Sequence, residues 1–148
     1  MNTSTSSNTQ NWPAVRRTLE MILPLADTFA FMFYNRFFEY EPAARSLFKA
    51  DMSTQRKKVI NLLAFALRGL DRPYLIEKEL RRLGRHHAQY QISRQQYEHL
   101  NEAIIWAFGE TLGSNFNEES RQAWHHALNA ITTIMLAAAA ETKAMPAI

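Results

Sequence analysis

Apolar residues recur three and four positions apart along most of this chain, the spacing that places them on one face of an α-helix. Polar residues, proline and glycine separate six such stretches. The six stretches predict six helices. Five of them cover residues 13–23, 25–40, 74–88, 93–112 and 117–143. The remaining one, third in the chain, begins after a cap at Asp51 or Ser53 and ends at residue 70. The third helix has the clearest stripe, and we expect its members to form one buried face: Val59, Leu62, Leu63, Ala66, Leu67 and Leu70.

Residues with known positional preferences mark several helix borders. Pro13 suits the first turn of a helix, where its missing N–H costs nothing. Pro42 ends the second helix, because the residue before a proline avoids the α region, and a short helical piece over 42–48 follows. Ser93 with Gln96 has the spacing of a capping box at the start of the fifth helix.

These segments predict one all-α domain over residues 12–143, with about six main helices plus short ones. Residues 1–11 are rich in Ser, Thr and Asn without an apolar run, so we expect a disordered lead-in and no signal peptide. Residues 144–148 are expected to be a C-terminal tail. No run of 18 apolar residues occurs, so we expect no membrane span, with the cytoplasm as the default location.

Composition narrows the possible chemistry. The 148 residues include no cysteine, which excludes disulfides and thiolate metal sites and leaves His, Met, Tyr, Asp and Glu as possible ligands. The net charge is +3, and the Lys and Arg residues are scattered among acids. We therefore expect solvated helix faces and no nucleic-acid partner. As an alternative, two short basic clusters could flank an anionic cofactor. The first is Arg56, Lys57 and Lys58, and the second is Arg81, Arg82 and Arg85.

Two adjacent histidines end the predicted fourth helix, in the segment Leu83-Gly84-Arg85-His86-His87-Ala88-Gln89-Tyr90-Gln91-Ile92. On its own, a histidine near a helix C-terminus usually interacts with the helix dipole and nothing else. The other histidines form no HxxxH or HExxH pattern, so no second metal site is expected from His99, His125 and His126.

Several motifs in the order of the chain resemble one family. They are Phe33-Tyr34-Asn35-Arg36-Phe37-Phe38, Glu41-Pro42, Leu47-Phe48, Gln55-Arg56, the segment from Leu83 to Ile92, Tyr97, and Ala123-Trp124. Together they resemble the bacterial globins, namely the globin domain of flavohaemoglobins and the single-domain haemoglobins of the same branch. The resemblance covers roughly residues 12–143 and implies a globin fold around a haem b cofactor (iron protoporphyrin IX).

The resemblance implies that His87 is the proximal ligand of the haem iron, because Tyr90 and Ile92 then fall where the family has them. Adjacent helical residues point about 100° apart, so only one of the two histidines can face the haem. We expect His86 at the haem edge or in solvent.

The family also implies a triad in which a tyrosine and a glutamate support the proximal histidine. Tyr97 lies ten residues after His87, and Glu141 lies seventeen residues after Trp124, as that pattern requires. The alternatives are that Tyr97 is a core aromatic and that Glu141 is an exposed residue near a helix end.

On the opposite side of the haem, the resemblance points to Tyr34 and Gln55 as groups that contact the bound gas. A hydroxyl or amide N–H stabilises a ligand that carries partial negative charge. The alternatives are that Tyr34 is a core tyrosine bonded to the backbone and that Gln55 is an exposed residue near a helix start.

Further haem contacts follow from the same resemblance. We expect Phe48 to pack on the ring, and Val59 and Ile104 to line the pocket, although both aliphatic residues also suit an ordinary core. The candidates to meet the haem propionates, each equally able to be a solvated side chain, are Lys58, Arg85 and Tyr90.

The resemblance implies a globin that binds O2 reversibly and reacts with NO, as a nitric oxide dioxygenase that draws electrons from an external reductase. Peroxidase-like activity is a further possibility. The alternative from another class is a non-enzymatic gas sensor or oxygen carrier, as in oxygen transport. A haem-free helical interaction module would require the ordered motifs to coincide by accident.

Overall fold

The computed structural model describes residues 10–47, 51–70 and 72–144, and these residues form α-helices and short 3-10 helices (η) without a strand. The α-helices are α1 (Trp12–Ile22), α2 (Ala26–Tyr40), α3 (Met52–Gly69), α4 (Pro73–His87), α5 (Arg94–Leu112) and α6 (Glu118–Ala144). The 3-10 helices are η2 (Leu23–Leu25), η3 (Pro42–Leu47), η4 (Ala88–Tyr90) and η5 (Gly113–Asn115). The predicted all-α class and its main helices are confirmed.

Local side-chain chemistry sets the helix borders. The Asp51 carboxylate accepts a hydrogen bond from the Thr54 N–H at 2.9 Å, so Asp51, and not Ser53, caps α3. The capping box that opens α5 is confirmed: the Gln96 N–H donates to the Ser93 hydroxyl at 3.1 Å, and the Ser93 N–H donates to the Gln96 side chain at 2.8 Å.

The predicted disordered lead-in over residues 1–11 extends too far. The Asn11 side chain caps α1 by accepting from the Ala14 N–H at 3.2 Å. The Gln10 amide donates to the Ala123 carbonyl of α6 at 3.0 Å. Residues 10 and 11 therefore belong to the folded domain, and the rest of the predicted lead-in, like the tail over 145–148, lies outside the described residues.

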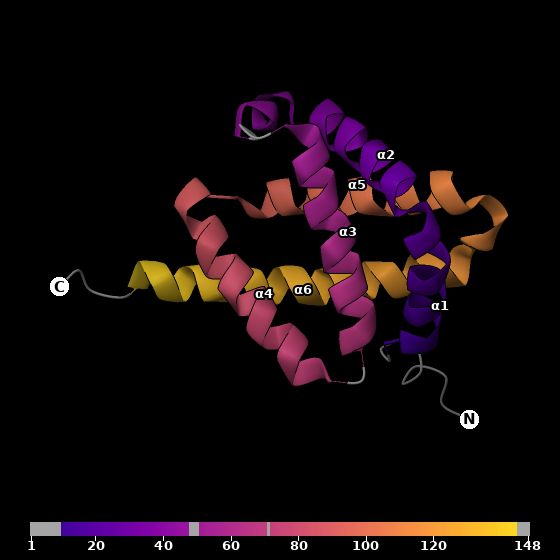
Figure 1. Ribbon diagram of the computed structural model, residues 1–148. Helices are drawn as coiled ribbons and strands as arrows, with labels where there is room; N and C mark the ends of the chain where they lie inside the picture. Colours follow the sequence, from indigo (N-terminus) through magenta and orange to yellow (C-terminus); the bar gives the residue numbers. More distant parts are fainter. Residues whose placement is uncertain (1–9, 48–50, 71, 145–148) are drawn as a thin grey trace.

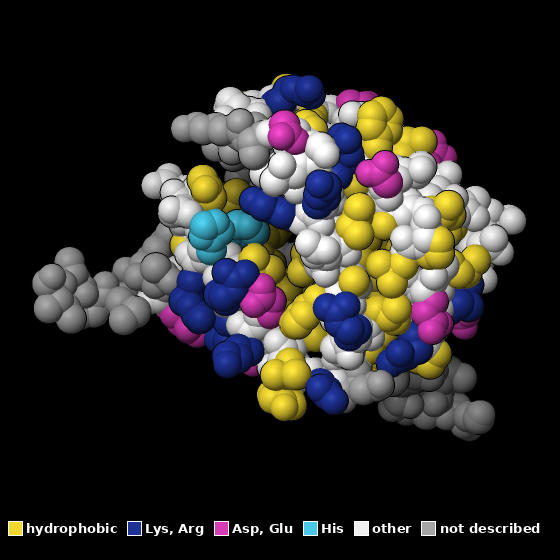
Figure 2. Space-filling model, viewed as in Figure 1, with side chains coloured by type: hydrophobic (Ala, Val, Ile, Leu, Met, Phe, Trp, Pro, Cys, Tyr) yellow, Lys and Arg dark blue, Asp and Glu magenta, His cyan; other side chains and the backbone are white. Residues whose placement is uncertain are grey.

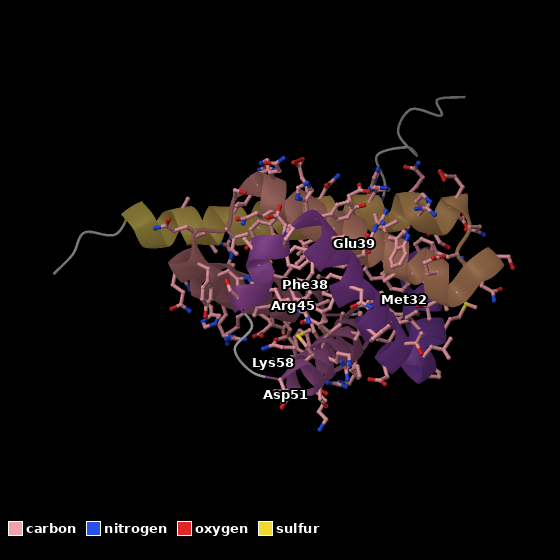
Figure 3. All side chains as sticks on the ribbon, turned by 90° about the horizontal axis from the view of Figure 1, so that it is seen from above. Met32, Phe38, Glu39, Arg45, Asp51 and Lys58 are labelled. Atoms are coloured by element: carbon pink, nitrogen blue, oxygen red, sulfur yellow. The ribbon has the colours of Figure 1, made fainter. Side chains whose placement is uncertain are left out.

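The helices are arranged around α5 and α6, which run side by side through the molecule, while α3 crosses in front of them (Figure 1). Helix α2 packs on α5, and α4 packs on α6. Arg45 of η3 lies over the Phe38 ring, with its guanidinium carbon 5.2 Å from the ring centroid, and holds η3 against α2 (Figure 3).

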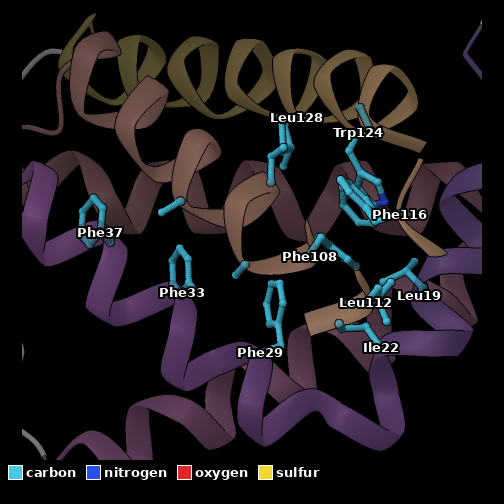
Figure 4. Packing of buried hydrophobic residues seen from close by; sticks show 14 of the residues in the cluster. Leu19, Ile22, Phe29, Phe33, Phe37, Phe108, Leu112, Phe116, Trp124 and Leu128 are labelled. Carbon is cyan, nitrogen blue, oxygen red and sulfur yellow. The ribbon is translucent and has the colours of Figure 1, made fainter. Parts of the chain in front are cut away.

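Aromatic side chains from α2, α5 and α6 fill the larger of two core clusters (Figure 4). The ring centroids of Phe29 and Phe108 are 4.9 Å apart, and those of Phe108 and Trp124 are 4.6 Å apart. The Trp124 indole N–H donates to the Thr18 hydroxyl at 2.7 Å, which satisfies a buried donor and ties α6 to α1.

A second, smaller cluster joins α4 to α5 and α6 through Leu80, Tyr97 and Met135. Ile131 packs against both clusters and links them. Gly84 allows α4 to approach α6 this closely, because a Cβ at that position would lie 2.5 Å from the Met135 carbonyl oxygen.

The prediction that the apolar stripe of α3 forms a buried face is wrong, because the stripe packs on the core but is only partly buried. Of the described residues of α3, only Gly69 is buried, while Leu62 is 44% exposed. Val59, Leu63, Ala66 and Leu67 pack against the larger core cluster but are only partly buried. An apolar helix face that protein atoms leave half covered is available to an apolar ligand.

Gly84→Ala should lower the free energy of unfolding by about 1–3 kcal/mol, because the new methyl group would overlap the backbone of Met135 rather than a movable side chain. Urea denaturation of the purified variant measures the change.

The matched control is Gly109→Ala in α5. Its Cβ would meet only the Arg121 Nη2 atom at 3.7 Å and the Phe116 ring at 4.0 Å, which are ordinary contacts. We expect this variant to gain up to about 1 kcal/mol from better helix propensity. A Gly84→Ala variant as stable as the wild type would contradict the close contact of α4 with α6.

Candidate functional site

The last turn of α4 carries His87, and α4 contacts α3, whose apolar face is half covered. The His87 side chain is half-buried, and its imidazole has no hydrogen-bond partner within the described part of the chain. Burial lowers the pKa of His87, and the neighbouring charges of His86 and Arg82 lower it further. His87 is therefore neutral at neutral pH, and a neutral imidazole has a nitrogen lone pair for a metal.

His86 points in a different direction from its neighbour. It is exposed, its ring centroid lies 5.8 Å from that of His87, and its Nδ1 atom lies 3.3 Å from the Gln89 amide nitrogen. Figure 2 shows the histidine side chains at this end of α4, next to a hollow in the surface toward α3 and with Lys and Arg side chains nearby.

A small cavity of about 20 Å³ adjoins His87, room for about one water molecule. It is lined by His87, Ala88, Gln91, Ile92, Tyr97 and Ala139. The structure thus brings together His87, Ile92 and Tyr97, three residues predicted from the sequence. Tyr97 is 5% exposed, and burial raises the pKa of its phenol, which keeps it protonated.

The predicted triad is not formed in the structure, because Glu141 has another partner. The Glu141 carboxylate accepts a hydrogen bond from Arg81 at 3.1 Å, and the Glu141 side chain is 58% exposed. Arg81 also pairs with Glu77 one turn earlier on α4. Glu141 thus joins α4 to α6 at the surface and does not line the cavity beside His87.

Tyr34 lies in the aromatic layer of α2. It is 7% exposed, and its ring centroid is 4.8 Å from Phe33 and 6.0 Å from Phe38. Burial raises the pKa of Tyr34 to about 12. The phenol therefore stays protonated.

The other predicted contacts lie on several elements. Gln55 and Val59 are half-buried one turn apart on α3, and Ile104 of α5 packs against the larger core cluster. The predicted propionate contacts are all exposed: Lys58 near the start of α3 (Figure 3), Arg85 on α4 and Tyr90 in η4. Phe48 lies outside the described residues.

Two features were not predicted from the sequence. Gln91, which lines the cavity beside His87, has a left-handed backbone with φ of 54°, where Gly or Asn would be usual. A hollow of about 340 Å³ lies between α2, α5 and the start of α6, where the Arg36 guanidinium is 5.0 Å from the rings of both Tyr40 and Trp106. No histidine lines this larger hollow, so it is not the place for a histidine-held metal.

No group of three or more His, Cys, Asp or Glu side chains that could hold a metal ion occurs within residues 10–47, 51–70 and 72–144. A metal held through His87 would thus need the rest of its ligands from elsewhere, as an iron porphyrin provides. None of the described helices is both long and apolar enough to cross a membrane.

Comparison with known proteins assigns the family. The globin family model matches residues 32–135, which is most of the chain. This chain belongs to the globin family. The globin is also similar in structure to RmaNOD, an engineered carbene transferase described as a variant of a proposed nitric oxide dioxygenase from Rhodothermus marinus. The TM-score is 0.74 and the identity 24%, over 88% of this chain and 94% of the other. That likeness supports the globin fold.

The family implies a haem cofactor, and the residues of this globin fit one. A haem is a flat, largely apolar ring with one metal and two carboxylates. The chain offers the half-covered apolar face of α3 for the ring and the neutral, unbonded imidazole of His87 for the iron. The exposed Lys58 and Arg85 are suitable for the carboxylates.

The raised pKa of Tyr34 predicts a pH dependence of stability. The folded-state pKa of about 12 lies above the value of about 10 for an unfolded chain. The stabilisation is fully present below about pH 10 and is lost as the pH rises through about 12, because the unfolded state releases its proton first. Between these values the wild type should lose about 1–3 kcal/mol more unfolding free energy than Tyr34→Phe.

Urea denaturation at intervals from pH 9 to 12 measures both proteins. Tyr97 is present in both and cancels in the comparison. Parallel curves for the two proteins would show that the Tyr34 phenol is solvated and not buried.

Proposed function

We propose that this globin holds haem b through His87, binds oxygen reversibly and oxidises nitric oxide to nitrate in the cytoplasm with electrons from an external reductase. The buried, protonated phenol of Tyr34 is the observation that carries the proposal beyond haem binding. The absence of cysteine agrees with a reducing compartment.

On the proximal side, His87 acts as the metal ligand and Tyr97 as a positioning residue. Both side chains line one small cavity, and Tyr97 is fixed in a cluster with Leu80 and Met135. A fixed tyrosine beside the imidazole limits its rotation, and Ile92 closes the same cavity with an apolar group. Glu141 has no part in this proposal, since it pairs with Arg81.

A bound haem supplies an iron that binds diatomic gases and changes its oxidation state. On the distal side, Tyr34 donates a hydrogen bond to a gas ligand that carries partial negative charge. Because Tyr34 lies among phenylalanines, water competes little for this hydrogen bond. Gln55 offers a second N–H donor from α3, while Val59 and Ile104 provide apolar walls, together with Phe48 as predicted from the sequence.

The residues that would hold the haem propionates are exposed: Lys58 near the start of α3, Arg85 near the end of α4 and Tyr90 in η4. The reaction combines one O2, one NO and one electron into one nitrate ion. In this proposal the electron comes from an external reductase. The name of the similar Rhodothermus marinus protein, which refers to a nitric oxide dioxygenase, supports this choice of reaction.

Tyr34→Phe should raise the dissociation rate of oxygen about tenfold to a hundredfold, because a hydrogen bond to a partly charged ligand contributes about 1.5–3 kcal/mol. The yield of nitrate from nitric oxide should fall with it. Stopped-flow absorption measures the dissociation rate, and nitrate assay of the haem-loaded protein measures the yield.

Tyr74→Phe is the matched control: Tyr74 is 71% exposed at the start of α4, so this variant should leave the dissociation rate of oxygen unchanged. A Tyr34→Phe variant that retains oxygen as long as the wild type would remove Tyr34 from the distal role. Haem-loaded wild type that holds oxygen but forms no nitrate would favour an oxygen carrier.

A further inference from the structure

Positive charge is concentrated in one part of this chain. The segment 56–85, which covers most of α3 and α4, contains nine Lys and Arg and only three Asp and Glu, a net charge of +6. The whole chain carries +3, so the remaining residues carry −3. A separation of charge of this kind orients a protein as it approaches a charged partner.

Six of these nine cations make no ion pair within the described part of the chain. Arg56 pairs with Asp27, Arg81 with Glu77 and Glu141, and Arg82 with Glu79. The other six are exposed and make no ion pair with a described residue: Lys57, Lys58, Arg68, Arg72, Lys78 and Arg85. Their charges are available to a partner. Two haem propionates would neutralise only two of them.

Apolar side chains are also exposed on these elements. Leu62 of α3 is 44% exposed, Tyr74 of α4 is 71% exposed, and Tyr90 of η4 is 47% exposed. Figure 2 shows Lys and Arg side chains near the histidines and among yellow apolar side chains on this face, with some Asp and Glu between them. Apolar groups within a charged rim are typical of a protein interface, whereas a nucleic-acid surface would be more uniformly basic.

We propose that the exposed face of α3 and α4 is the docking surface for an acidic electron-donor protein. This inference rests on the proposed function, in which a reductase must supply one electron per turnover. The donor is oxidised by one electron, which it passes to the bound haem. The cations of α3 and α4, the second of which carries His87, attract an acidic donor to this side of the molecule, which raises the association rate.

The test variant is Lys57→Gln/Arg68→Gln/Lys78→Gln, which removes three charges from this face and leaves the proposed propionate contacts intact. The matched control adds three negative charges at exposed positions outside α3 and α4, namely Ser114→Glu/Asn129→Glu/Ala130→Glu. The test variant and the control have the same net charge, so they differ only in where on the surface the charge was changed.

The probe is a photoreduced plant-type ferredoxin, an acidic one-electron donor, mixed with the ferric haem-loaded proteins in a stopped-flow instrument at low salt. We expect the test variant to be reduced about tenfold more slowly than the wild type, with a weaker salt dependence, and the control to stay within about twofold. Reduced methyl viologen, a cationic donor, should not be slowed by the test variant.

Equal ferredoxin rates for all three proteins, or equal slowing of both variants, would overturn the proposal. If both ferredoxin and methyl viologen reduced the test variant more slowly than the wild type, the three side chains would act in the haem pocket, and a docking role would be rejected. Tight binding of a duplex oligonucleotide at physiological salt would reassign the face to nucleic acid. Failure of the proposed haem function is distinguishable, because the ferric protein would then lack a Soret band before any donor is added.

Discussion

The close contact of α4 with α6 determines where the proposed metal ligand lies. Gly84 has no side chain, so α4 rests directly on the backbone of α6 at Met135. His87 follows one turn later at the end of α4 and lines one small cavity with Tyr97. A larger residue at position 84 would lift α4 from α6 and displace the imidazole from this cavity.

The second constraint is the apolar stripe of α3, which the rest of the protein covers only in part. In an ordinary helical bundle the apolar stripe of α3 would pack on a neighbouring helix and disappear from the surface. Here it is only partly buried, and α3 contacts α4, the helix that carries His87. An apolar face that remains half exposed costs stability, and burying it against an apolar ligand recovers about 25 cal/mol per Å². Haem binding is thus expected to stabilise the fold as well as to supply its chemistry.

Helix borders could be predicted from the sequence because their causes are local. The Ser93 and Gln96 capping box acts within four residues, and the structure has it as predicted. The residues whose placement depends on competing partners could not be predicted this way. Spacing placed Glu141 near the end of the last helix but did not reveal that Arg81 binds its carboxylate. Periodicity identified the apolar side of α3 but not how much of it protein atoms cover. The left-handed conformation of Gln91 has no signal in the residue type.

Titration of hemin into the wild type, His87→Ala and His86→Ala, followed by the Soret absorption, tests whether His87 holds the haem iron. We expect one hemin per chain and the same spectrum for the wild type and His86→Ala. His87→Ala should lose that spectrum, and added imidazole should restore it by taking the ligand position. A His87→Ala protein with the wild-type spectrum and affinity would show that His87 is not the ligand, and a wild type that takes up no hemin would show that this chain holds no haem.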